Sequence, residues 1–124
     1  MIESQIFRSV VVHKLKGDLT NRDAIDAKAF VQGNLDSLPA TFTVLWDLRE
    51  ANFLRSDEDF QVMVQAIANS KDPENNRKKR AFLVSNDAHQ ARVGRVLSKA
   101  KAPWPWSCFM DFAQAAQWLS GEAA

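Results

Sequence analysis

Two short apolar runs constrain the fold of this 124-residue chain more than any other feature. Residues 41–46 read TFTVLW and residues 81–84 read AFLV, with almost no polar side chain in either run. Runs of this length are typical of strands that are covered on both faces, as in the centre of a mostly parallel sheet. The side chains expected to be buried on these two central strands are Val44, Trp46, Phe82 and Val84.

The N-terminal segment predicts an antiparallel hairpin. Residues 8–17, RSVVVHKLKG, are β-branched and then alternate between apolar and polar side chains, which favours a strand with one partly wetted face. The apolar face of that strand includes His13. Residues 2–7 would form its partner, with a tight turn at Arg8 and Ser9.

Four other segments have the spacing of amphipathic helices. Thr20 and Asp23 resemble a capping box, and the helix that they begin would end at Pro39. The caps expected of the third and last helices are Asn86 or Asp87, and Asp111. The inner faces expected of the four helices are Ala27, Phe30, Val31, Leu35 and Leu38; Phe60, Met63, Val64, Ile67 and Ala68; Val93, Val96, Leu97 and Ala100; and Phe112, Ala115, Ala116 and Leu119.

These elements follow the order ββαβαβαβα, with residues 106–110 as the last strand. Strands that alternate with helices imply right-handed crossovers and a mostly parallel sheet. We therefore expect one α/β domain over residues 1–124, with about five strands, four helices and an antiparallel N-terminal edge hairpin.

Composition excludes several classes of function. Sixteen Lys and Arg against fifteen Asp and Glu leave a net charge of +1, so no overall field attracts nucleic acid or anionic lipid. The lone Cys108 excludes an internal disulfide, and its apolar neighbours favour a small buried residue over a reactive thiol. Charges interrupt the N-terminus, and the apolar runs are far shorter than the ~20 residues of a membrane helix. We expect a soluble cytoplasmic domain.

No catalytic or cofactor motif is present. The chain has no GxSxG, GxxxxGK[ST] or GxGxxG sequence, so acyl and phosphoryl transfer lack their usual parts. His13 and His89 are the only histidines, and no acid stands at a telling spacing from either. Metal ligation by scattered carboxylates is neither indicated nor excluded. We therefore predict no catalytic residue, no cofactor and no dedicated metal site.

The order of four motifs resembles the SpoIIAA-like family. These motifs are LKGDLT, TVLWDLREANF, AFLVSND and CFMDFAQAAQWL, and the resemblance extends over residues 6–119. That family belongs with the STAS domains, the anti-sigma-factor antagonists, and shares an architecture class with CRAL-TRIO lipid-binding proteins. The resemblance implies a SpoIIAA/STAS-like sandwich that acts without chemistry, as a regulatory or protein-interaction module. The alternative that it implies is a carrier of a small apolar, lipid-like ligand.

The resemblance also places Ser56 on a residue that a partner kinase phosphorylates in signalling STAS domains. There an Asp precedes the serine, whereas here Arg55 precedes it and three acids follow at 57–59. A phosphate would gain from a helix N-terminus and from Arg55, but the carboxylates would repel it. The simpler interpretation is that Ser56 caps a helix and Asp59 completes the capping box, and the two roles are compatible.

Three further groups of residues are candidates for binding. Asp47 with Arg49, and with Arg55 beyond them, could frame a ligand or partner pocket at the end of the central strand, although bonding of Asp47 to nearby backbone amides is the more ordinary explanation. Trp104 and Trp106 either cover the core or form an exposed interaction surface.

A basic patch is the last candidate. Arg92, Arg95 and Lys99 share one face of the third helix, and together with residues 77–80, RKKR, they could bind an acidic partner, a phosphorylated headgroup or RNA. A solvated helix face beside a charged loop is the more ordinary explanation. Because aromatic residues interleave with neither cluster, we expect no nucleic acid partner. We therefore expect the partner to be another protein, with a small apolar ligand as the alternative.

The capping interpretation of Ser56 makes a testable prediction. Ser56→Ala should lower the free energy of unfolding by about 0.5–2 kcal/mol in a denaturant titration, and Ser56→Asp by much less, because Asp caps as well as Ser. Partner binding by the Ser56→Asp variant should equal that of the wild type. Phosphate found on Ser56 by mass spectrometry of protein from its native cell would contradict the prediction that this serine only caps.

Overall fold

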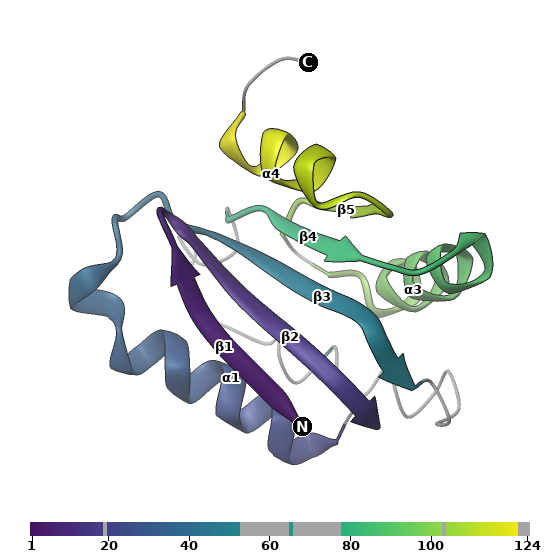
Figure 1. The fold of residues 1–124 in the computed structure, drawn as a ribbon, viewed down its shortest axis with the longest axis horizontal. Coiled ribbons are helices and arrows are strands. Elements are labelled where there is room, and N and C mark those ends of the chain that lie inside the picture. The colour runs from purple at the N-terminus through teal and green to yellow at the C-terminus, as the bar shows by residue number, and fades with distance from the viewer. Residues whose placement is uncertain (19, 53–64, 66–77, 103, 122–124) are drawn as a thin grey trace.

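The computed structural model describes residues 1–18, 20–52, 65, 78–102 and 104–121, and they form one five-stranded sheet with the strand order β1-β2-β3-β4-β5. The first two strands pair antiparallel, and every other neighbouring pair is parallel (Figure 1). The strands are β1 (Ile2–Phe7), β2 (Val10–Asp18), β3 (Thr43–Asn52), β4 (Arg80–Leu83) and β5 (Trp106–Phe109). The predicted mostly parallel sheet with an antiparallel edge is confirmed.

The hairpin turns where the sequence predicted. Phe7 pairs with Val10, so Arg8 and Ser9 alone form the loop between β1 and β2. Arg8 has a φ of 56°, in the left-handed region that side chains other than Gly seldom adopt. The backbone amide of Thr43 donates a hydrogen bond of 3.0 Å to the carbonyl of Ser9, which holds the turn against the start of β3.

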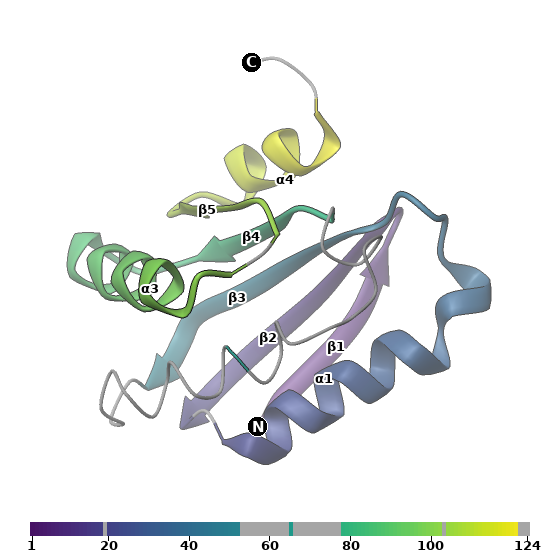
Figure 2. The ribbon, with the colours of Figure 1, turned by 180° about the vertical axis from the view of Figure 1, so that it is seen from behind.

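Helices cover the sheet unequally. The described helices are α1 (Asn21–Gly33), the short 3-10 helix η1 (Leu35–Ser37), α3 (Asp87–Ala100) and α4 (Phe112–Ser120). The helices α1 and α3 lie on one face of the sheet and α4 lies on the other (Figures 1 and 2). The described residues thus form three α-helices rather than the four expected. The other expected helix, with its inner face between residues 60 and 68, lies outside the described residues.

Local capping fixes where the helices begin. The Thr20 side chain accepts a hydrogen bond of 3.2 Å from the Asp23 amide, and the Asp23 carboxylate accepts one of 2.9 Å from the Thr20 amide. This is the predicted capping box. Asn86 accepts from the amide of His89 at 2.9 Å, and Asp111 caps α4 in the same way. All three predicted caps are confirmed. Caps are predictable from sequence because their hydrogen bonds join residues that are close along the chain.

The prediction that the first helix continues to Pro39 is wrong. The helix ends at Gly33, and the Asn34 side chain donates a hydrogen bond of 2.7 Å to the carbonyl of Phe30. Gly and Asn are poor helix formers that favour helix ends, and here they outweigh the apolar spacing beyond them. Leu35, expected on the inner face, is therefore exposed.

The larger core lies between the sheet and the helices α1 and α3. Trp104 is buried there and its ring stacks on that of Phe82 at 6.1 Å between centroids, while Trp106 is half-buried. The pair thus covers the core, as one of the two interpretations of the sequence expected. All four side chains predicted on the central strands, and all four predicted on α3, are buried: Val44, Trp46, Phe82, Val84, Val93, Val96, Leu97 and Ala100.

The smaller core lies under α4. It consists of Val12, Leu45, Ala81, Leu83, Ala115 and Leu119. Ala115 and Leu119 face inward as predicted, and Ala116 is half-buried. The prediction for Phe112 is wrong, because its side chain is 41% exposed. The helix α4 contacts the sheet through Ala115 and Leu119, and the ring of its first residue, Phe112, projects beside that contact.

Two polar side chains are buried in the larger core. His13 is 2% exposed, its Nδ1 lies 2.7 Å from Ser4 Oγ, and its ring lies 4.6 Å from that of Trp46. Burial lowers the pKa of His13 from 6.5 to about 4, and the nearby charge of Arg80 acts in the same direction. This histidine is structural.

The sequence placed Arg80 in a solvated basic loop, and that placement is wrong. Arg80 is the first residue of β4 and is 5% exposed, with its guanidinium 4.7 Å from the centre of the Trp104 ring and a hydrogen bond of 2.7 Å to the carbonyl of Lys78. Burial lowers the pKa of Arg80 to about 10. A guanidinium stacks well on an aromatic ring, so this cation is held inside the core rather than on a surface patch.

Two phenylalanines test the division between core and surface. Phe82→Ala should lower the free energy of unfolding by about 3–5 kcal/mol, because it empties a packed aromatic site. The same change at the exposed Phe112 should cost less than about 1 kcal/mol. Denaturant titration of both variants measures the difference, and a loss below about 1 kcal/mol at Phe82 would show that β4 is misplaced.

The buried His13 predicts a pH dependence of stability. Its pKa is about 4 in the folded chain and 6.5 when unfolded, so the unfolded state binds the proton more tightly. The stability that this histidine contributes is complete above pH 6.5 and is lost as the pH falls toward 4, by about 3 kcal/mol in all.

Comparison with His13→Gln isolates this contribution from that of the carboxylates. The wild type should lose more stability than the variant between pH 7 and pH 4.5, when unfolding is followed by urea titration. Parallel losses in the two proteins would show that His13 is solvated.

Candidate interaction surface on the open face of the sheet

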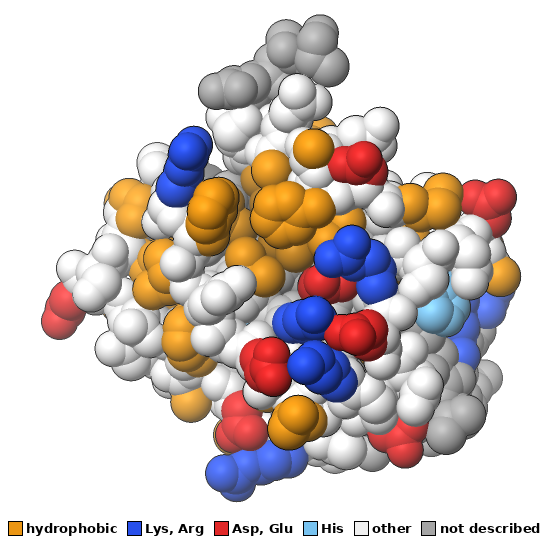
Figure 3. All heavy atoms as spheres, viewed as in Figure 1, with side chains coloured by type: hydrophobic (Ala, Val, Ile, Leu, Met, Phe, Trp, Pro, Cys, Tyr) orange, Lys and Arg blue, Asp and Glu red, His pale blue; other side chains and the backbone are white. Residues whose placement is uncertain are grey.

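One face of the sheet is only partly covered by the described helices. On that face α4 packs on β4 and β5, with a smaller contact to β3. The side chains that β1, β2 and β3 direct to this face therefore lie beside α4 (Figure 3). Most are in contact with solvent, whereas Val12, Leu45 and Asp47 are buried. We call this surface the open face, and its members are Glu3, Gln5, Phe7, Val10, Val12, Lys14, Lys16, Thr43, Leu45, Asp47, Arg49 and Glu50.

One half of the open face carries paired charges. Three ion pairs join Lys16 to Glu3 at 3.5 Å, Lys14 to Glu50 at 3.0 Å, and Arg49 to Asp47 at 2.9 Å. Three cations and three carboxylates cancel, so this half has no net charge. The two lysine pairs are exposed, and such pairs contribute little to stability, about 0–1 kcal/mol each.

The pair of Asp47 and Arg49 was predicted as the frame of a pocket. The guanidinium donates from Nε and Nη2 to the two carboxylate oxygens, each at 2.9 Å, and the Arg49 amide donates to Oδ1 at 3.2 Å. Burial acts to raise the pKa of Asp47, but the hydrogen bonds from Arg49 outweigh it and the pKa lies below its ordinary value. Asp47 thus binds a backbone amide, as the simpler interpretation expected, and a pocket framed by Asp47 and Arg49 stays a prediction.

The expected position of Asp47 at the carboxyl end of the central strand is wrong. The strand β3 continues to Asn52, so Asp47 lies in its middle. A bulge interrupts the pairing of β3 with β2 just beyond Asp47, because Lys14 pairs with Asp47 whereas Lys16 pairs with Glu50. The strand order also never reverses direction, so the described sheet has no switch-point crevice of the kind that holds ligands in doubly wound folds.

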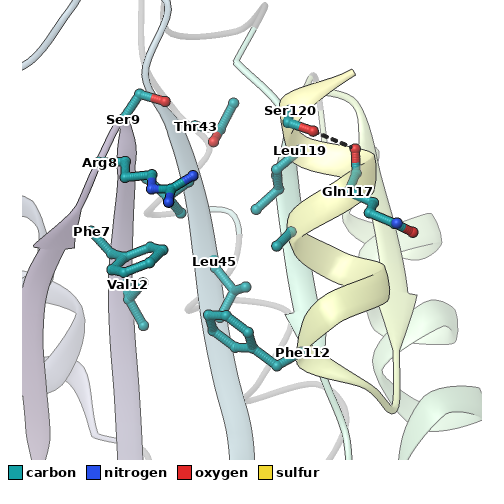
Figure 4. A pocket seen from close by; sticks show the side chains of 12 residues that line it. Phe7, Arg8, Ser9, Val12, Thr43, Leu45, Phe112, Gln117, Leu119 and Ser120 are labelled. Atoms are coloured by element: carbon teal, nitrogen blue, oxygen red, sulfur yellow. Dashed lines mark hydrogen bonds between the residues drawn. The ribbon is translucent and has the colours of Figure 1, made fainter. Parts of the chain in front are cut away.

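The other half of the open face holds a groove of about 220 Å3 between the β1–β2 turn and α4. Figure 4 shows that polar side chains gather at one end, where Arg8, Ser9 and Thr43 lie, and that Phe7 and Phe112 lie toward the other end. The remaining lining residues are Val10, Val12, Leu45, Ala116, Gln117, Leu119 and Ser120. No sequence pattern indicated this groove, because its two walls come from opposite ends of the chain.

Two large apolar side chains flank the groove and remain exposed. Phe7 is 52% exposed and Phe112 is 41% exposed. In Figure 3 the apolar surface around α4 and the β1–β2 turn adjoins the paired charges. Exposed apolar patches beside polar rims mark interaction sites in many proteins.

The predicted basic patch lies away from this surface. Arg92, Arg95 and Lys99 belong to α3, on the opposite face of the sheet, and Arg92 is half-buried. The lysines before β4 bind backbone carbonyls instead: Lys78 Nζ donates to Ala40 at 2.5 Å and Lys79 Nζ donates to Trp118 at 3.0 Å, at the C-terminal end of α4. The described loop residues, Lys78 to Arg80, therefore have other partners, and a patch of Arg92, Arg95 and Lys99 on α3 stays a prediction.

The remaining candidate residues lie away from the open face or outside the described residues. Ser56 and Arg55 lie outside the described residues. Cys108 is half-buried, and burial raises the pKa of its thiol to about 11. Within the described ranges, no three His, Cys, Asp or Glu side chains gather as metal ligands, and no helix is long and apolar enough to span a membrane.

Comparisons with known proteins support the fold. No protein-family model matches the chain, and no curated protein matches it. Among solved structures, the chain is similar to an uncharacterised protein of the DUF3478 family from Shewanella loihica PV-4, which has a SpoIIAA-like fold. The likeness has a TM-score of 0.62 and 18% identity, and covers 96% of this chain and 92% of the other. The chain therefore has the SpoIIAA-like fold that its motifs implied.

Proposed function

We propose that this domain is a non-catalytic, STAS-like interaction module that binds a protein partner on its open face. The observation that carries this proposal is the pair of exposed rings, Phe7 and Phe112, beside the groove. Aromatic side chains that stay exposed on a folded domain supply the central contacts of many protein interfaces. The neutral, paired charges next to them would form the polar rim.

The chemistry of the described residues supports a role without catalysis. Asp47 is held ionised by Arg49, and the nearby charge of Lys14 also lowers its pKa, so this carboxylate is stabilised in the form that carries no proton to donate. His13 is buried and bonded to Ser4, and the raised pKa of Cys108 keeps its thiol protonated near neutral pH.

The groove fits an interaction surface better than a carrier site. Its volume of about 220 Å3 falls below the roughly 300–1,000 Å3 of pockets that enclose small ligands. The two rings at its edge stay exposed, whereas a carrier encloses its ligand. The groove thus gives little support to the alternative of a carrier for a lipid-like molecule.

The test is partner binding by variants of the open face. A double variant, Phe7→Ser with Phe112→Ser, should bind a partner recovered by cross-linking in the native host at least tenfold more weakly than the wild type, or about 1.4 kcal/mol. The matched control is Ile25→Ser on α1, because Ile25 is 60% exposed but lies on the other side of the sheet. Unchanged binding by the double variant, or equal loss by the control, would refute the proposed surface.

A further inference from the structure

Arg8 holds an unusual position at the groove. It is one of the two residues of the β1–β2 turn, and its φ of 56° is a conformation that favours glycine. Its guanidinium carbon lies 5.5 Å from the centre of the Phe7 ring, beside the groove. A strained backbone at an exposed arginine costs stability, and such strain is common where a side chain binds something.

The charge of Arg8 is not balanced within the groove. Among the described residues that line it, Arg8 is the one charged side chain. Lys14 and Lys16, on the same face, each pair with a glutamate, whereas the described ion pairs include none to Arg8. Ser9 and Thr43 add hydroxyl groups at the same end of the groove. This end is therefore complementary to an anion, and a guanidinium pairs best with a carboxylate or phosphate.

The rest of the groove is complementary to an apolar group. Val12, Leu45 and Leu119 line it and are buried, and Phe7 and Phe112 flank them (Figure 4). An occupant that covers both rings must extend across the groove rather than sink into it. A peptide does so while it places one or two side chains inside, whereas the chain of a lipid needs a longer enclosed cavity.

We propose that the groove binds an apolar peptide segment of the partner that carries a carboxylate, and that Arg8 pairs with this carboxylate. The inference rests on the proposed function and names the chemistry of the segment that the open face recognises. Arg8 selects the segment, and the apolar lining of the groove holds its side chains.

The test is a titration of the 15N-labelled protein with N-acetyl-leucyl-leucine, followed by NMR. The free carboxylate of this peptide should shift amide signals of residues 7–12, 43–45 and 112–120. The same peptide with a C-terminal amide, which differs only in charge, should bind at least fivefold more weakly. Arg8→Gln should weaken binding of the carboxylate peptide by a similar factor and leave binding of the amide unchanged.

Three further variants separate charge from the conformation of the turn. Arg8→Lys should retain most of the preference for the carboxylate. Arg8→Gly suits the positive φ, so it should keep the turn and lose the preference. Arg22→Gln removes an exposed arginine from α1 and should bind both peptides as the wild type does.

Several outcomes would overturn the inference. These are equal binding of the two peptides, no shifts at a peptide concentration of about 10 mM, and shifts confined to other residues. Tighter binding of decanoate than of the peptide at the same residues would make the groove a lipid site instead. If Phe7→Ser with Phe112→Ser loses the partner while Arg8→Gln retains it, the proposed function stands and only the carboxylate inference fails. If that double variant retains the partner, the proposed function itself fails.

Discussion

The direction in which the strands follow one another determines most of this structure. From β2 to β5 each strand is added on the same side of the one before. Right-handed crossovers that keep one direction place their helices on the same face, and α1 and α3 do lie on one face. Among the described helices only α4, which follows the last strand, lies on the opposite face. One helix cannot cover five strands, so the described helices leave open the half of that face farthest from β5.

The unequal cover of the two faces separates the polar side chains buried in the larger core from those that reach solvent on the open face. His13 and Arg80 lie in the larger core, where aromatic rings and hydrogen bonds compensate for their burial. On the open face, Lys14 and Arg49 pair with carboxylates in partial contact with solvent. Arg8 differs from both groups, because it combines a strained turn with a cation that the described ion pairs leave out. Arg8 thus lies on the opposite side of the sheet from the buried His13 and Arg80.

Local patterns predicted much of the fold, and tertiary placement decided the rest. The cap at Thr20 and the buried strand at Phe82 follow from neighbours in sequence and from apolar runs, so both were predictable. The burial of Arg80 depends on Trp104, which lies far along the chain, and no periodicity could indicate it. The groove was not predictable for the same reason, because its walls come from segments far apart in the sequence. The sequence did group Asp47 with Arg49. No sequence pattern indicated the bulge in the pairing of β2 with β3.

The exposure of the phenylalanine rings tests the open face most directly. The chain can be labelled with 4-fluorophenylalanine and its 19F spectrum recorded with a soluble gadolinium chelate, which broadens signals from rings in contact with solvent. The signals of Phe7 and Phe112 should broaden strongly, whereas those of the buried Phe42 and Phe82 should not. Protection of Phe7 and Phe112 equal to that of Phe82 would show that this face is covered in the isolated chain, and would contradict the account.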